Sequence, residues 1–216
     1  MDVKKSAPGR AYWLKTMHQW HWISSALCLL GMLLFAFTGI TLNHAADIEG
    51  QPTTVNRKAT LPAPLLGTLV DVAAKASASK QAAADTPVPA SVQQWLNNEM
   101  QVRVEGKDVE WSANEVYVAL PRPGGDAWVR VDLAEGEVEY ESTGRGWISY
   151  LNDLHKGRHS GLAWSWFIDI FAGACLVFSL TGLLILKFHA TNRPSTWPMV
   201  GLGVVIPVIL ALLFVH

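Results

Sequence analysis

Three long apolar stretches constrain the fold of this 216-residue chain more than any other feature. They cover residues 20–42, 162–186 and 197–215, and Asp169 is the one charged residue within them. A helix of about 20 mostly apolar residues is long enough to cross a bilayer. We therefore predict three transmembrane helices. The first is expected to be a retained anchor, because its apolar run is longer than that of a signal peptide.

The remaining composition excludes several classes of protein. Charged residues make up 16% of the chain, whereas soluble domains average about 25%. The net charge is −1, with 17 basic and 18 acidic residues, so we expect no nucleic-acid partner. The two cysteines both lie within apolar runs, so they cannot build a disulfide framework or a four-thiolate metal site.

Basic residues next to the spans predict the orientation. Residues 1–19 carry four Lys or Arg against one Asp, and the turn at 187–196 carries two basic residues and no acid. Lys and Arg concentrate in short cytoplasmic flanks. We therefore expect a multi-pass protein of the bacterial inner membrane, with a cytoplasmic N-terminus and a periplasmic C-terminus. Residues 43–161 are then periplasmic.

The segment between the first two spans predicts a small α+β domain. Residues 45–64 are polar and contain prolines, which is typical of a linker. Helical spacing indicates helices at 65–84 and at 91–100, the second with Ser91 as its N-cap. Alternating runs indicate strands at 101–104, 115–120, 127–132 and 137–141, and PRPGGD and LAEGE are expected hairpin turns. The predicted fold is three transmembrane α-helices with an antiparallel α+β domain inserted between the first two.

The histidines are the candidate chemical groups, because the α+β segment contains no nucleophile set and no phosphate-binding loop. Six of the seven lie beside the first two spans, at matching ends. The outer group is His44, His155 and His159, and the inner group is His18, His21 and His189.

A b-type haem suits this arrangement, since two imidazoles from antiparallel helices can ligate one iron from its two sides. One or two haems are expected. Along a helix, His159 to His189 spans about 45 Å, whereas His18 to His44 spans about 39 Å and His21 to His44 about 35 Å. The distance from His18 is the closer match, which favours His18 over His21 as the partner of His189. Zinc or copper bound by His155 and His159, four residues apart, is the alternative. Asp169 is a candidate partner of a ligating histidine.

The chain also resembles a known family. The strings WLKTMHQWHW, FTGITLNH, LNDLHKGRHSG and FSLTGLLIL look like the PepSY-associated transmembrane helix family, and the three predicted spans are similar to its short branch. The resemblance implies a PepSY-like fold for the soluble domain and places His18, His44, His155 and His159 at the family's histidine positions. It also implies b-type haem, because larger relatives are inner-membrane proteins that bind it and reduce iron in siderophore complexes.

Three functions follow as alternatives. The first is electron transfer to the periplasmic face through haem, as a component of a ferric or siderophore-iron reductase, with a periplasmic redox or iron-carrier partner. The second is a non-redox membrane anchor whose PepSY-like domain binds a protein or peptide as a regulator or inhibitor. The third is a metal-ion binding accessory protein. No residue is assigned a catalytic role, and a homodimer is compatible with the small residues in the spans.

Overall fold

The computed structural model describes residues 8–48, 50–77 and 86–215. Three of its helices are long and apolar enough to cross a membrane, which confirms the predicted spans. They are α1 (Pro8–Asn43), α7 (Leu162–His189) and α8 (Thr196–Phe214), and the 3₁₀ helix η1 (Ala190–Asn192) lies between the last two. Most large apolar side chains of these helices are exposed, as expected for surfaces that face lipid.

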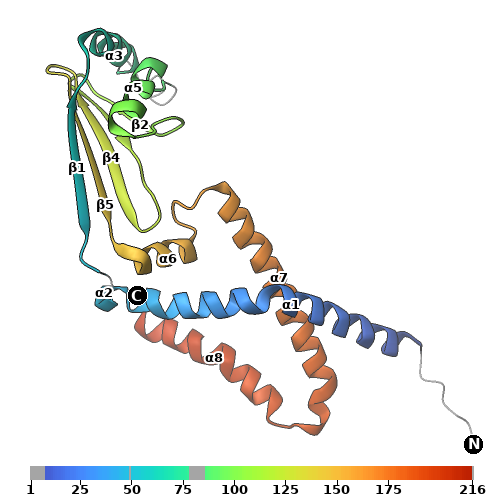
Figure 1. The fold of residues 1–216 in the computed structure, drawn as a ribbon. Coiled ribbons are helices and arrows are strands. Elements are labelled where there is room, and N and C mark those ends of the chain that lie inside the picture. Colours follow the sequence, from blue (N-terminus) through green and yellow to red (C-terminus); the bar gives the residue numbers. More distant parts are fainter. Residues whose placement is uncertain (1–7, 49, 78–85, 216) are drawn as a thin grey trace, which may run out of the picture. The chain divides into compact units, whose positions relative to one another are not determined.

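The chain divides into two compact units, one formed by residues up to Leu34 and from Trp166 onward, the other by Phe35–Ser165. The second unit contains a five-stranded antiparallel sheet with the strand order β1-β5-β4-β3-β2 (Figure 1). We call residues 50–156 the sheet domain. Its strands are β1 (Thr53–Thr60), β2 (Val109–Trp111), β3 (Glu115–Ala119), β4 (Gly125–Asp132) and β5 (Glu137–Gly144).

Helices α3 (Ala63–Ala76) and α5 (Ala90–Met100) pack on one face of this sheet. Successive strand residues point to opposite faces, and in β4 burial alternates with that period. The inward positions are mostly valines, which meet the apolar sides of α3 and α5. The core therefore lies on one side of the sheet, and the other side carries the polar positions.

Helix α6 (Gly146–Lys156) is held by buried polar contacts, whereas the short α2 (Ala45–Ile48) has no buried residue. The carboxylate of Asp153 accepts a 2.8 Å hydrogen bond from the backbone N–H of Gly124, in the turn between β3 and β4. Gly124 has φ +71°, and a Cβ there would lie 2.8 Å from the backbone of Tyr150. Only glycine fits this approach, so the turn and α6 are fixed against each other.

Three sequence predictions about the soluble segment were wrong. Residues 45–64 were expected to be a linker but contain the edge strand β1, whose side chains are almost all exposed and so show no alternation. Residues 101–104 form no strand, because Gln101 ends α5 in the left-handed conformation and the following residues pair with no other strand. The first residue of α5 is preceded by Pro89, so Pro89 and not Ser91 is its N-cap.

Other predictions about this segment agree with the structure. Strands β3, β4 and β5 lie where the alternating runs placed them, and β1 and β2 were not predicted. Helix α6 was not predicted either. The predicted helix at 65–84 corresponds to α3, and residues 78–84 of that prediction lie outside the described residues.

Candidate functional site

The imidazole of His155 lies against the end of α1. Its Nδ1 is 2.7 Å from Oγ1 of Thr38, and its ring centre is 5.0 Å from that of Phe35. A Cβ on Gly39 would lie 3.6 Å from Cε1 of His155, so the absence of a side chain there lets the ring sit close to the helix. Thr38 is buried and His155 half-buried.

The imidazole of His21 contacts a phenylalanine, a threonine and a glycine of α7 that correspond to those around His155. Its Nδ1 is 3.1 Å from both Oγ1 of Thr181 and the carbonyl oxygen of Phe178. Its ring stacks on that of Phe178, with centres 4.6 Å apart and planes 15° apart. A Cβ on Gly182 would lie 3.2 Å from Cε1 of His21.

Both histidines therefore rest on one sequence motif, Phe-x-x-Thr-Gly, which occurs at residues 35–39 of α1 and at residues 178–182 of α7. In each copy the threonine hydroxyl donates a hydrogen bond to the carbonyl of the phenylalanine, at 3.2 Å in α1 and 3.0 Å in α7. At His21 the carbonyl oxygen of Phe178 only accepts, so in the neutral ring Nδ1 donates and Nε2 holds the free lone pair. At His155 the same tautomer applies when the hydroxyl of Thr38 donates to the carbonyl of Phe35 and accepts from Nδ1.

Three further histidines near helix ends share this tautomer. The Nδ1 atoms of His18, His44 and His189 lie 2.8, 3.0 and 2.8 Å from the carbonyl oxygen four residues earlier. A carbonyl oxygen only accepts, so in each neutral ring Nδ1 donates and Nε2 is left unprotonated. The rings of His18 and His189 are 6.1 Å apart between centres and 82° apart in orientation.

This contact between His18 and His189 is the pairing that the helix-length estimate favours. At the other group, His155 contacts Thr38, and Asn152, one turn earlier in α6, contacts Thr41. His44 lies three residues beyond Thr41 and therefore on the same side of the chain. It lies six residues beyond Thr38, which corresponds to about 9 Å along the helix axis. The structure gives no direct ring contact between His44 and His155 among the described residues.

His159 and Asp169 differ from the other candidates. His159 is exposed, has φ +53°, and its Nε2 accepts a 3.2 Å hydrogen bond from the guanidinium Nε of Arg158. The Nε2 lone pair of His159 is thus already engaged, whereas His155 bonds Thr38 through Nδ1. Asp169 is exposed on α7, and the described residues offer its carboxylate no hydrogen bond or ion pair.

Two buried polar atoms, in residues before and after His155 in the sequence, have no partner in the described part of the chain. The amide nitrogen of Asn152 and the hydroxyl of Ser160 are buried without a hydrogen-bond partner among the described residues. Buried polar groups are rarely left unpaired in folded proteins, so these two atoms are available to a group with acceptor oxygens. Haem carries two propionate carboxylates, whose oxygens are acceptors of the kind that these two donors could bond.

A metal ion bound by side chains alone and a haem differ in how many protein ligands they require. Among the described residues, no three His, Cys, Asp or Glu side chains lie close enough together to hold a metal ion. A structural zinc site needs four such ligands and a catalytic one needs three. Haem needs one or two axial ligands because the porphyrin provides the other four.

The fold defines a multi-pass membrane protein with one sheet domain between its first two spanning helices. A family model described as PepSY_TM-like matches residues 12–216. The chain belongs to this PepSY_TM-like family, which confirms the resemblance seen in the histidine-containing motifs. No curated protein and no solved structure matches the chain.

Sequence reasoning identified the histidines but missed the groups that hold them. These are Phe35, Thr38 and Gly39 on α1, and Phe178, Thr181 and Gly182 on α7. A signal was present, because the two copies of Phe-x-x-Thr-Gly lie in the strings FAFTG and FSLTG. What the sequence lacks is the pairing of each copy with a histidine more than 100 residues away.

Proposed function

We propose that this chain is a b-type haem protein of the bacterial inner membrane that carries electrons to a periplasmic acceptor. The observation that supports it is the repeated Phe-x-x-Thr-Gly motif, which holds one histidine of each group with its Nε2 free. Ligating histidines usually have their other ring nitrogen bonded to an oxygen, which sets the tautomer and the ring orientation. Both motif-bound histidines have that bond.

Each group contains the residues that a haem would need. In the outer group, His155 and His44 are the proposed axial ligands, and Asn152 and Ser160 offer donors to the propionates. In the inner group, His189 is paired with His21 or His18. When bound, haem supplies one-electron iron chemistry. The chain itself orients the imidazoles through Thr38 and Thr181.

The proposed orientation rests on the flanking basic residues, which put the N-terminus in the cytoplasm and the sheet domain in the periplasm. Electrons crossing between the two groups would cover roughly a membrane thickness, so a second copy of the chain or a redox partner is expected to assist. Ferric iron, free or in a siderophore, is the acceptor that the family resemblance suggests.

Dithionite-reduced minus oxidised absorption spectra of the detergent-purified full chain test the proposal. We expect a b-type α-band, reduced by His155→Ala and by His189→Ala but retained in His159→Ala. His18→Ala and His21→Ala then identify the second inner ligand. A colourless protein, purified from cells that load haem into other membrane proteins, would refute haem binding and favour the anchor. Stoichiometric metal without porphyrin would favour the metal-binding accessory instead.

A further inference from the structure

The outward face of the sheet, opposite α3 and α5, has an acidic surface with two aromatic rings at its centre. The strand register places alternate residues of all five strands on this face. The rings of Tyr117 and Trp128, from β3 and β4, stack there with centres 6.1 Å apart. Acidic residues outnumber basic ones on the strands of this face, with Glu110, Glu115, Asp126, Asp132, Glu137, Glu139 and Glu141 against Lys58 and Arg130.

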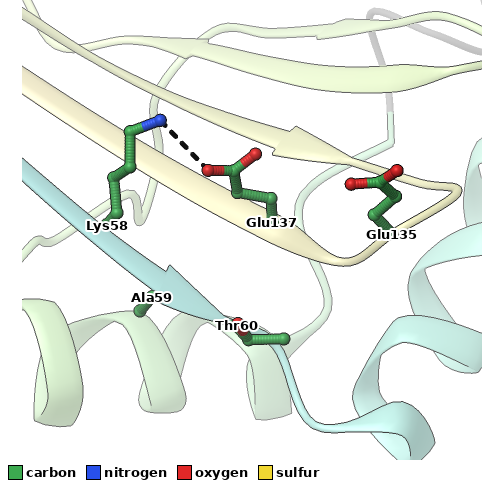
Figure 2. Close-up of a pocket in the computed structure, with 5 residues that line it drawn as sticks. All are labelled: Lys58, Ala59, Thr60, Glu135 and Glu137. Atoms are coloured by element: carbon green, nitrogen blue, oxygen red, sulfur yellow. Dashed lines mark hydrogen bonds and ion pairs between the residues drawn. The ribbon is translucent and has the colours of Figure 1, made fainter.

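The two cations on this face are already engaged. Lys58 forms ion pairs with Glu137 and Glu139, and Arg130 pairs with Glu139 and Glu115. Figure 2 shows Lys58 reaching Glu137 in an open recess of about 440 Å³ at the β1–β5 edge. The hydrogen bonds from Lys58 and Arg130 hold the pKa of Glu139 below its usual range. Both cations of this part of the face are therefore paired with carboxylates of the same face.

A neighbouring recess keeps an unpaired carboxylate. It has a volume of about 160 Å³, and its lining includes Asn56, Trp128 and Glu141. Two cations also line it, but Arg57 donates to the carbonyl of Met100 and Lys58 is paired with Glu137 and Glu139. The register puts these three directly opposite one another on β1, β4 and β5, where cross-strand side chains are in contact range. Within the described part of the chain, the carboxylate of Glu141 makes no hydrogen bond or ion pair.

An aromatic face beside a free carboxylate and an amide is the chemistry that recognises a guanidinium group. The planar cation stacks on tryptophan, and its N–H groups bond a carboxylate in a two-pronged geometry. A lysine ammonium lacks the planar fork and is more strongly hydrated. The surrounding acidic residues would attract a cationic segment over about 8–10 Å at physiological salt.

We propose that this face binds an arginine-rich segment of a partner protein, with one guanidinium group between the Trp128 ring and the Glu141 carboxylate. The interaction is separate from haem binding and uses none of the histidines. It gives the sheet domain a recognition role of its own, toward a partner with a basic surface.

The test is fluorescence anisotropy of labelled octa-arginine, octa-lysine and octa-glutamate peptides with the full chain in a non-ionic detergent. We expect octa-arginine to bind several-fold more tightly than octa-lysine, and octa-glutamate not to bind. Glu141→Gln should weaken octa-arginine binding about tenfold, the range of a desolvated cation–π or charge contact. Trp128→Ala should do the same, and Trp128→Phe should retain part of the affinity.

Glu110→Gln is the matched control. It removes the same charge from the same face, but on β2, three strands away from Glu141. Its expected effect on octa-arginine binding is less than twofold. Equal effects of Glu110→Gln and Glu141→Gln, equal binding of the two basic peptides, or no binding of octa-arginine would overturn the proposal. Because the readout does not involve haem, failure here leaves the haem proposal intact, and the reverse also holds.

Discussion

Replacing Thr38 by valine tests whether the Phe-x-x-Thr-Gly motif orients a haem ligand. Valine has nearly the same shape as threonine but no hydroxyl, so the change removes the 2.7 Å hydrogen bond to Nδ1 of His155 together with the 3.2 Å hydrogen bond to the carbonyl of Phe35. Leaving a buried donor unpaired costs about 1–3 kcal/mol. Loss of such a partner to a metal-binding histidine typically lowers affinity about 10–100-fold. These ranges agree, since about 1.4 kcal/mol corresponds to tenfold.

The assay is titration of the haem-stripped full chain with haemin in detergent, followed by Soret absorbance. Thr38→Val should weaken one site about 10–100-fold and leave the other unchanged. Thr181→Val should weaken the other site by a similar factor, because its hydroxyl contacts His21 in the same way. Thr38→Ser keeps the hydroxyl and should restore most of the affinity.

Thr16→Val provides the control for this series. It is the same substitution on the same helix, but the hydroxyl of Thr16 donates only to the backbone carbonyl of Tyr12. Its haem affinity should stay within about twofold of the unmodified chain. If Thr38→Val and Thr16→Val bind haem equally well, the threonine does not position a ligand and the reasoning from the motif fails.

Three further predictions concern stability. Gly31→Leu should lower the free energy of unfolding of the purified chain by about 1–3 kcal/mol, because any side chain there meets the ring of Phe171. Gly201 has open space around it, so Gly201→Leu should leave the free energy of unfolding unchanged. Leu96→Ala should destabilise the sheet domain by about 2–5 kcal/mol and speed its proteolysis; an unchanged cleavage rate would contradict the core assignment. The pKa of Glu139 is lowered in the fold, so its stabilising contribution is present at neutral pH and lost as the pH falls below about 4.5. Glu139→Gln should therefore flatten the acid side of the stability profile, and an unchanged profile would refute the linkage.

The membrane-spanning helices could be predicted from sequence because their signal is local. A run of apolar residues without charge has few alternatives, so the three spans were located to within a few residues at most ends. The first is the exception, because α1 begins at Pro8 and includes polar residues before the apolar run. Helical propensity and the apolar run are separate signals, and the predicted bounds of the span follow the apolar run alone.

Strand β1 and helix α6 could not be predicted because tertiary contacts determine them. The residues of β1 are mostly polar and exposed, and its conformation depends on pairing with β5, about 80 residues later in the chain. Helix α6 buries the polar residues Ser149, Asn152 and Asp153 and leaves the large side chains of Trp147 and Tyr150 exposed, which reverses the usual burial of an amphipathic helix. Its partners are a turn glycine and the threonines of α1.

For the candidate site, the histidines and the helix ends at which they lie could be predicted from the sequence, but the orientation of their rings could not. The hydrogen bond of His155 to Thr38 and the engagement of His159 by Arg158 depend on how the chain folds around α6. These contacts distinguish two histidines that the sequence alone leaves equivalent.

The haem content of the purified full chain, measured by the pyridine haemochrome assay, tests the proposed function most directly. The two copies of the histidine-binding motif predict two b-type haems per chain. A chain that contains no haem, after expression in cells that supply haem to other membrane proteins, would contradict it.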